Sequence, residues 1–275
     1  MTVNHNMDSP VKTGKAGDVA AKAGSQTIGS SDDARQMKCL DLTLRTPAEN
    51  LACDEGLLDF CEGGCGHEIL RFWEPQTHFV VLGHANRVAT EVDREACERL
   101  GIPVLRRCSG GGTVLQGPGC LNYSLILKFD GAGPLRTISS TNEFILKRHS
   151  AALSALVGQT VELQGQSDLA IGGLKVSGNA QRRKRQFLLF HGTLLLQLDL
   201  ALVGTVLPMP SKQPAYRHNR PHREFLANLG LPAESVKRAI REAWNAFEPL
   251  ETFPLETTAL LARDKYATTG WNLKF

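Results

Sequence analysis

The sequence has no long hydrophobic run: nowhere among its 275 residues do about 18 apolar residues stand together, as a membrane-spanning helix requires. The amino-terminal segment also lacks the apolar core of a secretory signal, which predicts a cytoplasmic protein. Residues 1–36 are mostly small and polar and cannot bury enough surface to fold alone. We therefore expect a disordered tail over 1–36 and one domain over 37–275.

The sequence also lacks a large excess of positive or negative charge. Lysine and arginine number 31 and acidic residues 28, and the net charge of +3 is too small to indicate nucleic acid or a membrane as a partner. The seven cysteines are an odd number in a chain without an export signal, which favours free thiols over disulfides. Cys61, Cys65 and His67 have a C-x3-C-x-H spacing, but no second pair of ligands follows, so no metal site is predicted there.

Short strand and helix patterns follow one another from residue 38 without a regular βαβ rhythm. Strands are expected over 39–44, 68–74, 78–83 and 121–129, with several more between 160 and 200. Helices are expected over 47–61, 94–100 after an Asp93 cap, from Ser139 or Ser140 to about 157, and 235–247. This order predicts an α+β domain with a mixed or antiparallel sheet.

The first of two glycine-rich segments, RRCSGGGTVLQGPGCLNYSLIL, covers residues 106–127. Its three consecutive glycines allow a ligand to approach the main chain closely, and Arg106 and Arg107 offer charge to a carboxylate or phosphate. The segment contains neither a P-loop nor a GxGxxG turn, since the residues after the glycines have a β pattern. A plain flexible hairpin remains the alternative.

The second segment, GLKVSGNAQRRKRQFLLFHGTLLL, covers residues 173–196. Lys175 stands between pairs of small residues, where an ammonium could neutralise a developing carbonyl oxygen or a phosphate. Taken alone, Lys175 could equally be a surface lysine, His191 a structural histidine and 182–185 a solvated hairpin tip. Together the two segments predict a backbone-lined pocket with fixed positive charge for a phosphorylated acyl group.

These segments resemble the two signature blocks of the lipoate–protein ligase and octanoyltransferase catalytic-domain family, which is related to biotin–protein ligases. The resemblance extends to NLACDEGLL at 50–58, VVLGHANR at 80–87 and SDLAIGG at 167–173, and it spans roughly 40–275. It implies a class II synthetase-like α+β fold with a mixed, largely antiparallel sheet flanked by helices.

The resemblance also implies roles for individual residues. Lys175 would be catalytic, contacting the acyl carbonyl and the phosphate. The residues implied to bind the acyl group or the nucleotide are Gly83, Asn86, Arg107, Ser109, Gly110, Gly111, Gly112, Asp168, Ser177, Gly178, Ala180, His191, Gly192 and Thr193. The chain departs from the family pattern at Gln116-Gly117, where many ligases have His-Asp, at Cys120, where asparagine is frequent, and at His84, where arginine is frequent.

The chemistry implied by the resemblance is activation of lipoate or octanoate by ATP with Mg²⁺. The acyl-AMP would then acylate a lysine of a lipoyl-domain protein, such as a 2-oxo acid dehydrogenase E2 or the glycine cleavage H protein. The chain ends at WNLKF, about where a separate accessory domain begins in full-length ligases, which implies a possible accessory-domain subunit.

Two other functions fit the same segments. An ATP-independent octanoyl or lipoyl transferase would need a cysteine nucleophile, which in related transferases lies just upstream of the lysine motif. This chain has Ser167 to Ala170 there and no cysteine after 120, so the nucleophile would be Cys108 or Cys120. The protein could also be a non-catalytic module that binds a lipoyl-type group.

A basic stretch at 208–229 is a further candidate for partner binding. Four cations cluster around Tyr216 in this stretch: Lys212, Arg217, Arg220 and Arg223. One interpretation is a surface loop that packs its aromatic residues against the core. The other is a basic rim that attracts an acidic acceptor domain.

Overall fold

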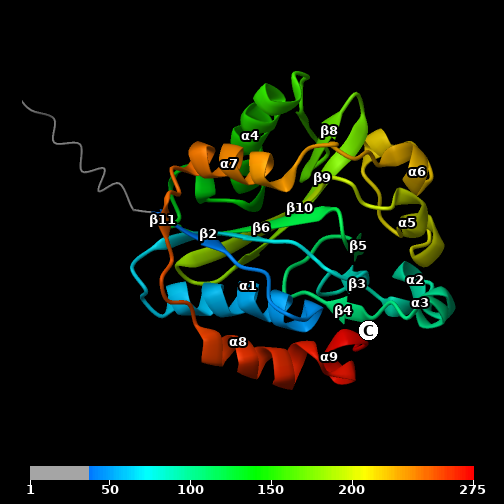
Figure 1. The fold of residues 1–275 in the computed structure, drawn as a ribbon, viewed down its shortest axis with the longest axis horizontal. Coiled ribbons are helices and arrows are strands. Elements are labelled where there is room, and N and C mark those ends of the chain that lie inside the picture. The colour runs from blue at the N-terminus through cyan, green and yellow to red at the C-terminus, as the bar shows by residue number, and fades with distance from the viewer. Residues whose placement is uncertain (1–36) are drawn as a thin grey trace, which may run out of the picture. The chain divides into compact units, whose positions relative to one another are not determined.

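An eight-stranded sheet organises residues 37–275, the part of the chain that the computed structural model describes (Figure 1). The expected tail over 1–36 lies outside the described residues. In spatial order the strands are β11 (Glu248–Pro249), β1 (Met37–Asp41), β2 (Glu68–Trp73), β6 (Cys120–Lys128), β10 (Phe187–Leu195), β9 (Leu174–Arg183), β8 (Asp168–Ile171) and β7 (Glu162–Gln164). Strand β1 pairs in parallel with β11 and β2, and every other pair is antiparallel. The predicted mixed, largely antiparallel sheet is confirmed.

A second, three-stranded sheet was not predicted as a separate unit. It contains β4 (Val104–Arg106), β3 (Phe79–Leu82) and β5 (Val114–Gln116), with β3 in the centre. Helices α2 (Val88–Glu91) and α3 (Arg94–Leu100) connect β3 to β4. The predicted Asp93 cap of α3 is confirmed, because its carboxylate accepts a hydrogen bond from the Ala96 amide.

Helices cover both faces of the large sheet. In Figure 1, α4 (Ile138–Val157) and α7 (Ala233–Trp244) lie above the sheet, whereas α1 (Pro47–Glu62) lies below it with α8 (Leu255–Leu261) and α9 (Thr269–Asn272). Alternate residues of β6 face opposite layers, so Leu121, Tyr123, Leu125 and Leu127 join the core under α4 and α7, while Ile126 packs with α1. The same alternation puts the polar Asn122 on the α1 side, where the site forms.

The ends of the long helices follow local capping rules. Thr46 and Glu49 form a reciprocal capping box at the start of α1, where Pro47 occupies the first turn. The cap of α4 is Thr137, so the prediction of Ser139 or Ser140 was wrong. Ser140 instead takes the third position of the box, and its hydroxyl oxygen accepts a hydrogen bond from the Thr137 amide. Thr137, Ser139, Ser140 and Thr141 all carry hydroxyl groups, so the sequence leaves the capping residue ambiguous.

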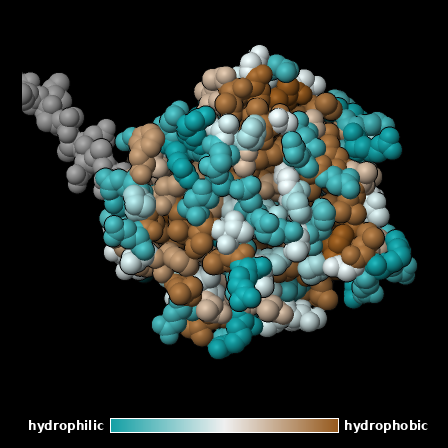
Figure 2. Space-filling model, viewed as in Figure 1, coloured by the Kyte–Doolittle hydropathy of each residue, from teal (hydrophilic) through white to brown (hydrophobic). Residues whose placement is uncertain are grey.

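The remaining elements are short. They are η1 (Gly133–Leu135), α5 (Leu200–Val206), η2 (Ala215–Arg217), α6 (His222–Phe225) and the π-helical turn η3 (Ala262–Tyr266). None of the helices within residues 37–275 has the length and apolar character needed to cross a bilayer. Figure 2 shows apolar areas interrupted by polar residues on the face seen in Figure 1.

Candidate active site

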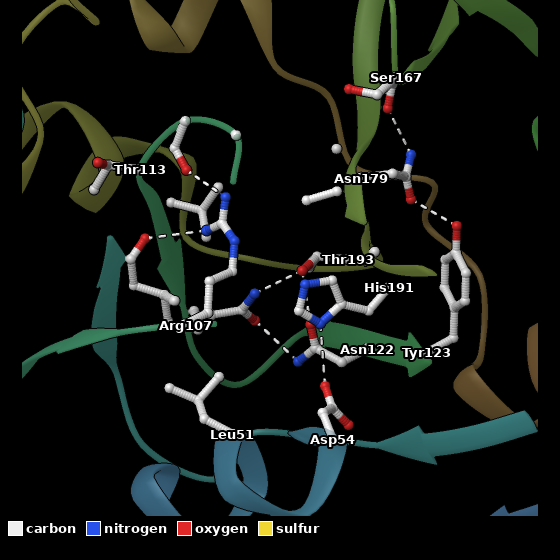
Figure 3. A pocket seen from close by; sticks show the side chains of 18 of the residues that line it. Leu51, Asp54, Arg107, Thr113, Asn122, Tyr123, Ser167, Asn179, His191 and Thr193 are labelled. Atoms are coloured by element: carbon white, nitrogen blue, oxygen red, sulfur yellow. Dashed lines mark hydrogen bonds and ion pairs between the residues drawn. The ribbon is translucent and has the colours of Figure 1, made fainter. Parts of the chain in front are cut away.

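A cavity of about 150 Å³ lies between the α1 side of the large sheet and the loop that joins β4 to β5 (Figure 3). It brings together most of the residues named from the sequence: Arg107, Gly111, Gly112, Asp168, Lys175, Gly178, Ala180, His191, Gly192 and Thr193. The others do not line it: Gly83, Asn86, Ser109, Gly110 and Ser177. Both glycine-rich segments therefore contribute to one site, although they are far apart in the chain.

The Arg107 side chain holds the glycine loop in shape from within. Its Nη2 donates to the carbonyl oxygens of Gly110 at 2.6 Å and Gly112 at 2.7 Å. Burial lowers the pKa of Arg107 to about 10, so the guanidinium remains charged at neutral pH. Gly111 has φ of +88°, and a Cβ there would lie 2.9 Å from the guanidinium. The loop thus requires both the arginine and the glycine.

Gly83 and Asn86 support this loop from behind. A Cβ on Gly83 would lie 2.2 Å from the Gly111 carbonyl oxygen and 2.3 Å from Asn86 Oδ1. The His84 amide, next in the chain, donates to the Ser109 carbonyl oxygen at 2.8 Å. The turn after β3 therefore needs glycine for close packing against the loop.

A chain of hydrogen bonds joins the loop to α1 and β2. Ser109 Oγ lies 2.6 Å from His191 Nε2, and His191 Nδ1 lies 3.2 Å from Asp54 Oδ2. Arg71 donates to the other oxygen of Asp54 at 2.6 Å. Burial alone would raise the pKa of Asp54, but Arg71 and His191 hold that pKa below its usual range. Asp54 is thus an ionised, fixed partner that orients the imidazole at the cavity wall.

This arrangement has the residue types of a Ser-His-Asp triad without a usable nucleophile. Ser109 is 1% exposed, does not line the cavity and accepts a hydrogen bond from Arg107 Nε at 3.1 Å. In this position Ser109 is not placed to attack a ligand in the cavity. We conclude that Ser109 positions His191 and the glycine loop.

The side chain of Lys175 is held in place by Asp168 and has room because residue 178 is glycine. Its Nζ lies 2.8 Å from Asp168 Oδ1, and the Tyr216 hydroxyl donates to Asp168 Oδ2 at 2.9 Å. A Cβ on Gly178 would lie 2.8 Å from the ammonium nitrogen. The Ser-Gly after Lys175 therefore provides the space in which the lysine side chain lies along its own strand.

Asn179 is a site residue that the sequence reasoning missed. Its Oδ1 accepts from the Tyr123 hydroxyl at 2.6 Å, and its Nδ2 donates to the Ser167 carbonyl oxygen at 2.8 Å (Figure 3). Ser177, two residues earlier, is fully buried. A period of two along the strand groups Asn179 with the buried Ser177 rather than with Gly178 and Ala180, so the strand pattern gave no signal for Asn179.

A closed ring of neutral hydrogen bonds forms another part of the wall. Gln116 Nε2 donates to Thr193 Oγ1 at 2.6 Å, Thr193 donates to Asn122 Oδ1 at 2.6 Å, and Asn122 donates back to Gln116 Oε1 at 3.0 Å. Gln116 stands where the resemblance described above led us to expect histidine. A Cβ on the following Gly117 would lie 2.2 Å from the His78 ring, so His78 occupies the space beside this departure from the family pattern.

The cavity has an apolar part and an apolar neighbour. Leu51, Trp73, Val81 and Val114 line the cavity itself. A second cavity, of about 90 Å³, shares Thr113, Val114, Lys175, Gly178 and Thr193 with the first. Its other apolar lining residues are Leu115, Leu195, Leu198, Val203, Leu207, Phe225 and Leu226. Lys175 therefore lies where two partly apolar spaces meet.

The two cysteines considered as nucleophiles are buried beside the site without lining it. Cys108 is 3% exposed and Cys120 is 2% exposed. Burial raises the pKa of each thiol to about 12, the opposite of what a reactive thiolate requires. All seven cysteines, which lie within the described residues, are free thiols, as predicted.

Of the two interpretations of 208–229, the basic rim is wrong for its central residues. Arg217 is 3% exposed, and its guanidinium lies over the Phe225 ring, 4.7 Å from the centroid. Arg220 Nη2 donates to the carbonyl oxygens of Gly173 and Tyr216. Arg217 therefore holds the segment together from within, and Arg220 links it to the turn before β9, which agrees with the packed-loop interpretation.

Sequence comparison with known proteins assigns the chain to a family. The profile of the lipoyl protein ligase A/B catalytic domain matches residues 46–243. Lipoate–protein ligase 1 of Staphylococcus aureus is 29% identical over 237 residues, covering 82% of this chain and 70% of the relative. The octanoyltransferase LipM of Geobacillus kaustophilus is 27% identical over 265 residues, covering 83% and 94%. The chain belongs to the lipoyl protein ligase A/B catalytic-domain family, as the sequence resemblance suggested.

Solved structures show the same fold. A lipoate–protein ligase A bound with ATP superimposes with a TM-score of 0.72 at 26% identity, covering 87% of this chain and 98% of that one. The bipartite lipoate protein ligase of Thermoplasma acidophilum superimposes with a TM-score of 0.71 at 24% identity, covering 86% and 97%. The chain is an enzyme of the family that contains lipoate–protein ligases and octanoyltransferases.

Proposed function

We propose that the protein is an ATP-dependent ligase that joins lipoate or octanoate to a lysine of a lipoyl-domain protein. The observation that carries the proposal is the position of Lys175 at the junction of two cavities, with no thiol lining the first cavity and none lining the second. One ammonium there can contact both a carboxylate and a phosphate, the two groups that an adenylation reaction brings together.

The acyl chain would occupy the apolar part of the first cavity. Leu51, Trp73 and Val114 supply apolar surface for a medium-length chain, and the neutral Gln116–Asn122–Thr193 ring adds no charge beside it. The acid's carboxylate would then point to Lys175. The same space accepts an alkyl chain or a dithiolane ring, so lipoate and octanoate are both proposed substrates.

The nucleotide would extend from the glycine loop into the second cavity. Backbone groups of the exposed loop can approach the phosphates without interference from side chains. The adenine ring would lie against Leu115, Leu195 and Phe225, which form an apolar wall beside Lys175.

Magnesium would be held by the phosphates and Asp168. Asp54 and Asp168 are the carboxylates among the described residues that line the first cavity, and Asp54 is committed to Arg71 and His191. Mg²⁺ is commonly bound by one or two carboxylates with substrate phosphates. Asp168, which here pairs with Lys175 and accepts from the Tyr216 hydroxyl, would bind the ion once Lys175 turns to the phosphates. The ion would supply charge neutralisation at the phosphates.

The reaction would take place in two steps. The acid's carboxylate oxygen attacks the α-phosphorus of ATP, forming acyl-AMP and releasing pyrophosphate. The neutral ε-amine of the acceptor lysine then attacks the acyl carbonyl, forming an amide and releasing AMP and a proton. Lys175 stabilises the negative charge that develops on the phosphate and carbonyl oxygens, and His191, held by Asp54, keeps the cavity wall in place.

Intact-protein mass spectrometry tests the proposal directly. The purified protein is mixed with an apo E2 lipoyl domain and octanoate or lipoate, with and without ATP and magnesium, and a parallel tube contains octanoyl carrier protein instead. Acylation that requires ATP supports the ligase. Acylation only from the carrier protein would assign a transferase. If neither tube shows acylation, an accessory-domain subunit is added. Absence of acylation even then would contradict a catalytic function.

A further inference from the structure

Basic side chains gather on the outer side of the glycine loop, around Trp271. The Nζ atoms of Lys265 and Lys274 lie 4.1 and 3.9 Å from the centre of the Trp271 ring. His84 packs edge-on against the same ring, and its Nε2 lies 3.3 Å from Lys274 Nζ. We call Arg106, Arg182, Lys265, Lys274 and His84 the Trp271 basic cluster.

The charge of this cluster is poorly compensated within the described residues. Glu55 forms an ion pair with Lys265 at 2.6 Å, but no carboxylate in residues 37–275 forms one with Arg106, Arg182 or Lys274. Burial first, and then repulsion by Arg106, Lys265 and Arg182, lowers the pKa of Lys274. A folded protein tolerates such repulsion most readily where a binding partner supplies the missing negative charge.

Arg106 and Arg182 connect the cluster to the loop. Arg106 is fully buried and donates to the carbonyl oxygens of Gly83, His84 and Asn86, while its Nη2 has no partner among the described residues. Arg182 Nη1 donates to the Cys108 carbonyl oxygen at 3.0 Å. These contacts hold positive charge at both ends of the segment that leads into the glycines.

The cluster lies beside the entrance to the first cavity. Arg182 follows Ala180 by two residues on β9, so both side chains lie on the same face of the strand, and Ala180 lines the cavity. Gly110, Gly111 and Gly112 are exposed, Gly111 and Gly112 line the cavity, and Arg182 contacts Cys108 just before them. A macromolecule that covers the bare loop would therefore contact the partly exposed Arg182, Lys265 and Lys274 and reach the cavity at the same time, whereas the buried Arg106 would act through its charge.

We propose that the Trp271 basic cluster is the docking surface for the acceptor, a protein domain with carboxylates close to its modifiable lysine. This inference rests on the proposed function, because it names the partner of that reaction. It places the basic surface on residues of β9 and the carboxy-terminal segment, and not on Arg217 and Arg220, where one interpretation of the sequence put it. Complementary charge at the rim of an interface mainly increases the association rate and fixes orientation.

Lys274→Glu reverses one charge without touching the cavity lining. The acceptor is an apo E2 lipoyl domain, its KM and kcat are measured by mass spectrometry, and adenylate formation is measured separately by ATP–pyrophosphate exchange. We expect the KM to rise at least about fivefold, with kcat and exchange unchanged. We also expect the KM of the wild type to increase with ionic strength, and that of the variant to increase less.

Lys147→Glu is the matched control, since Lys147 is an exposed lysine of α4 on the opposite side of the large sheet (Figure 1). An unchanged KM in Lys274→Glu, with normal exchange, would overturn the docking proposal and leave the ligase intact. If Lys274→Glu, but not Lys147→Glu, loses ATP–pyrophosphate exchange, the cluster binds the nucleotide, and the docking proposal is overturned as well. If the wild type shows no exchange, the ligase proposal fails separately. Docking is then judged from NMR titration of labelled apo domain, which should bind the wild type more tightly than Lys274→Glu.

Discussion

Gly192 lies directly beneath the amide of Asn179: a Cβ on Gly192 would be 1.7 Å from Asn179 Oδ1. The same Cβ would lie 2.9 Å from the Tyr123 ring, which donates its hydroxyl hydrogen to that oxygen. The His-Gly-Thr motif therefore requires glycine at its second position, because a side chain there would prevent Asn179 from reaching Tyr123 across β10. The steric requirement, rather than backbone flexibility, explains the glycine at this position of the motif.

Gly192→Ala should destabilise the protein by about 2–4 kcal/mol, because Asn179 must leave and a buried polar group loses its partners. Urea unfolding at neutral pH measures the effect. Gly204→Ala is the control, since Gly204 lies in α5 with open space around it and should gain about 1 kcal/mol in helix propensity. Adding Asn179→Ala should recover part of the loss, and strict additivity would argue against the steric explanation.

Lys175→Gln should reduce ATP–pyrophosphate exchange by about 100-fold or more while leaving the fold unchanged. The expectation follows from the position of Lys175 Nζ at the junction of the two cavities, next to Asp168. Lys212→Gln, at an exposed position on a nearby segment, should retain full activity. Comparable exchange in both variants would remove Lys175 from the mechanism, and circular dichroism would show whether either variant is misfolded.

Cys108→Ala and Cys120→Ala should each retain ATP-dependent acylation of the lipoyl domain. Both thiols are buried with pKa values of about 12 and neither lines the cavity, so neither can form an acyl thioester readily. Mass spectrometry of the wild type after reaction should show no hydroxylamine-sensitive acyl group on the enzyme. An acyl-enzyme that disappears in either variant would instead support the transferase.

His149 should make the protein less stable in mild acid. Burial, with a smaller contribution from Arg148, lowers the pKa of this imidazole from 6.5 to about 3. Between these values the unfolded chain binds a proton that the folded chain does not, so stability falls as pH decreases below about 6.5. The contribution at pH 5.5 is about 1.4 kcal/mol relative to high pH.

His149→Gln keeps an acceptor for the Trp244 indole N–H, which now donates to His149 Nε2 at 2.7 Å. The free energy of unfolding of the variant should therefore fall by about 1.4 kcal/mol less than that of the wild type between pH 8 and pH 5.5. Chemical denaturation at both pH values measures the difference. Equal pH dependence in the two proteins would mean that His149 is protonated in the folded state.

Local patterns were sufficient for much of the fold. The proline in the first turn of α1, the Asp93 cap and Gly101 end of α3, and the β-rich run of β6 act over a few residues, and these elements form close to where they were expected. The small sheet was missed because β4 and β5 contain three residues each and are held by β3 rather than by their own propensity. Long-range pairing of such short strands leaves little local signal.

The sequence by itself determined the residue types at the site: a glycine loop behind two arginines, a lysine before Ser-Gly, and a His-Gly-Thr strand. Only the tertiary structure decided what each side chain does. It turned Arg107 inward onto the loop carbonyl oxygens, placed Asp54 behind His191, buried both candidate cysteines and fastened Arg217 to Phe225. The physical reason is that burial, ion pairing and the direction of a side chain depend on neighbours from distant parts of the chain, whereas turns, caps and strand patterns depend on adjacent residues.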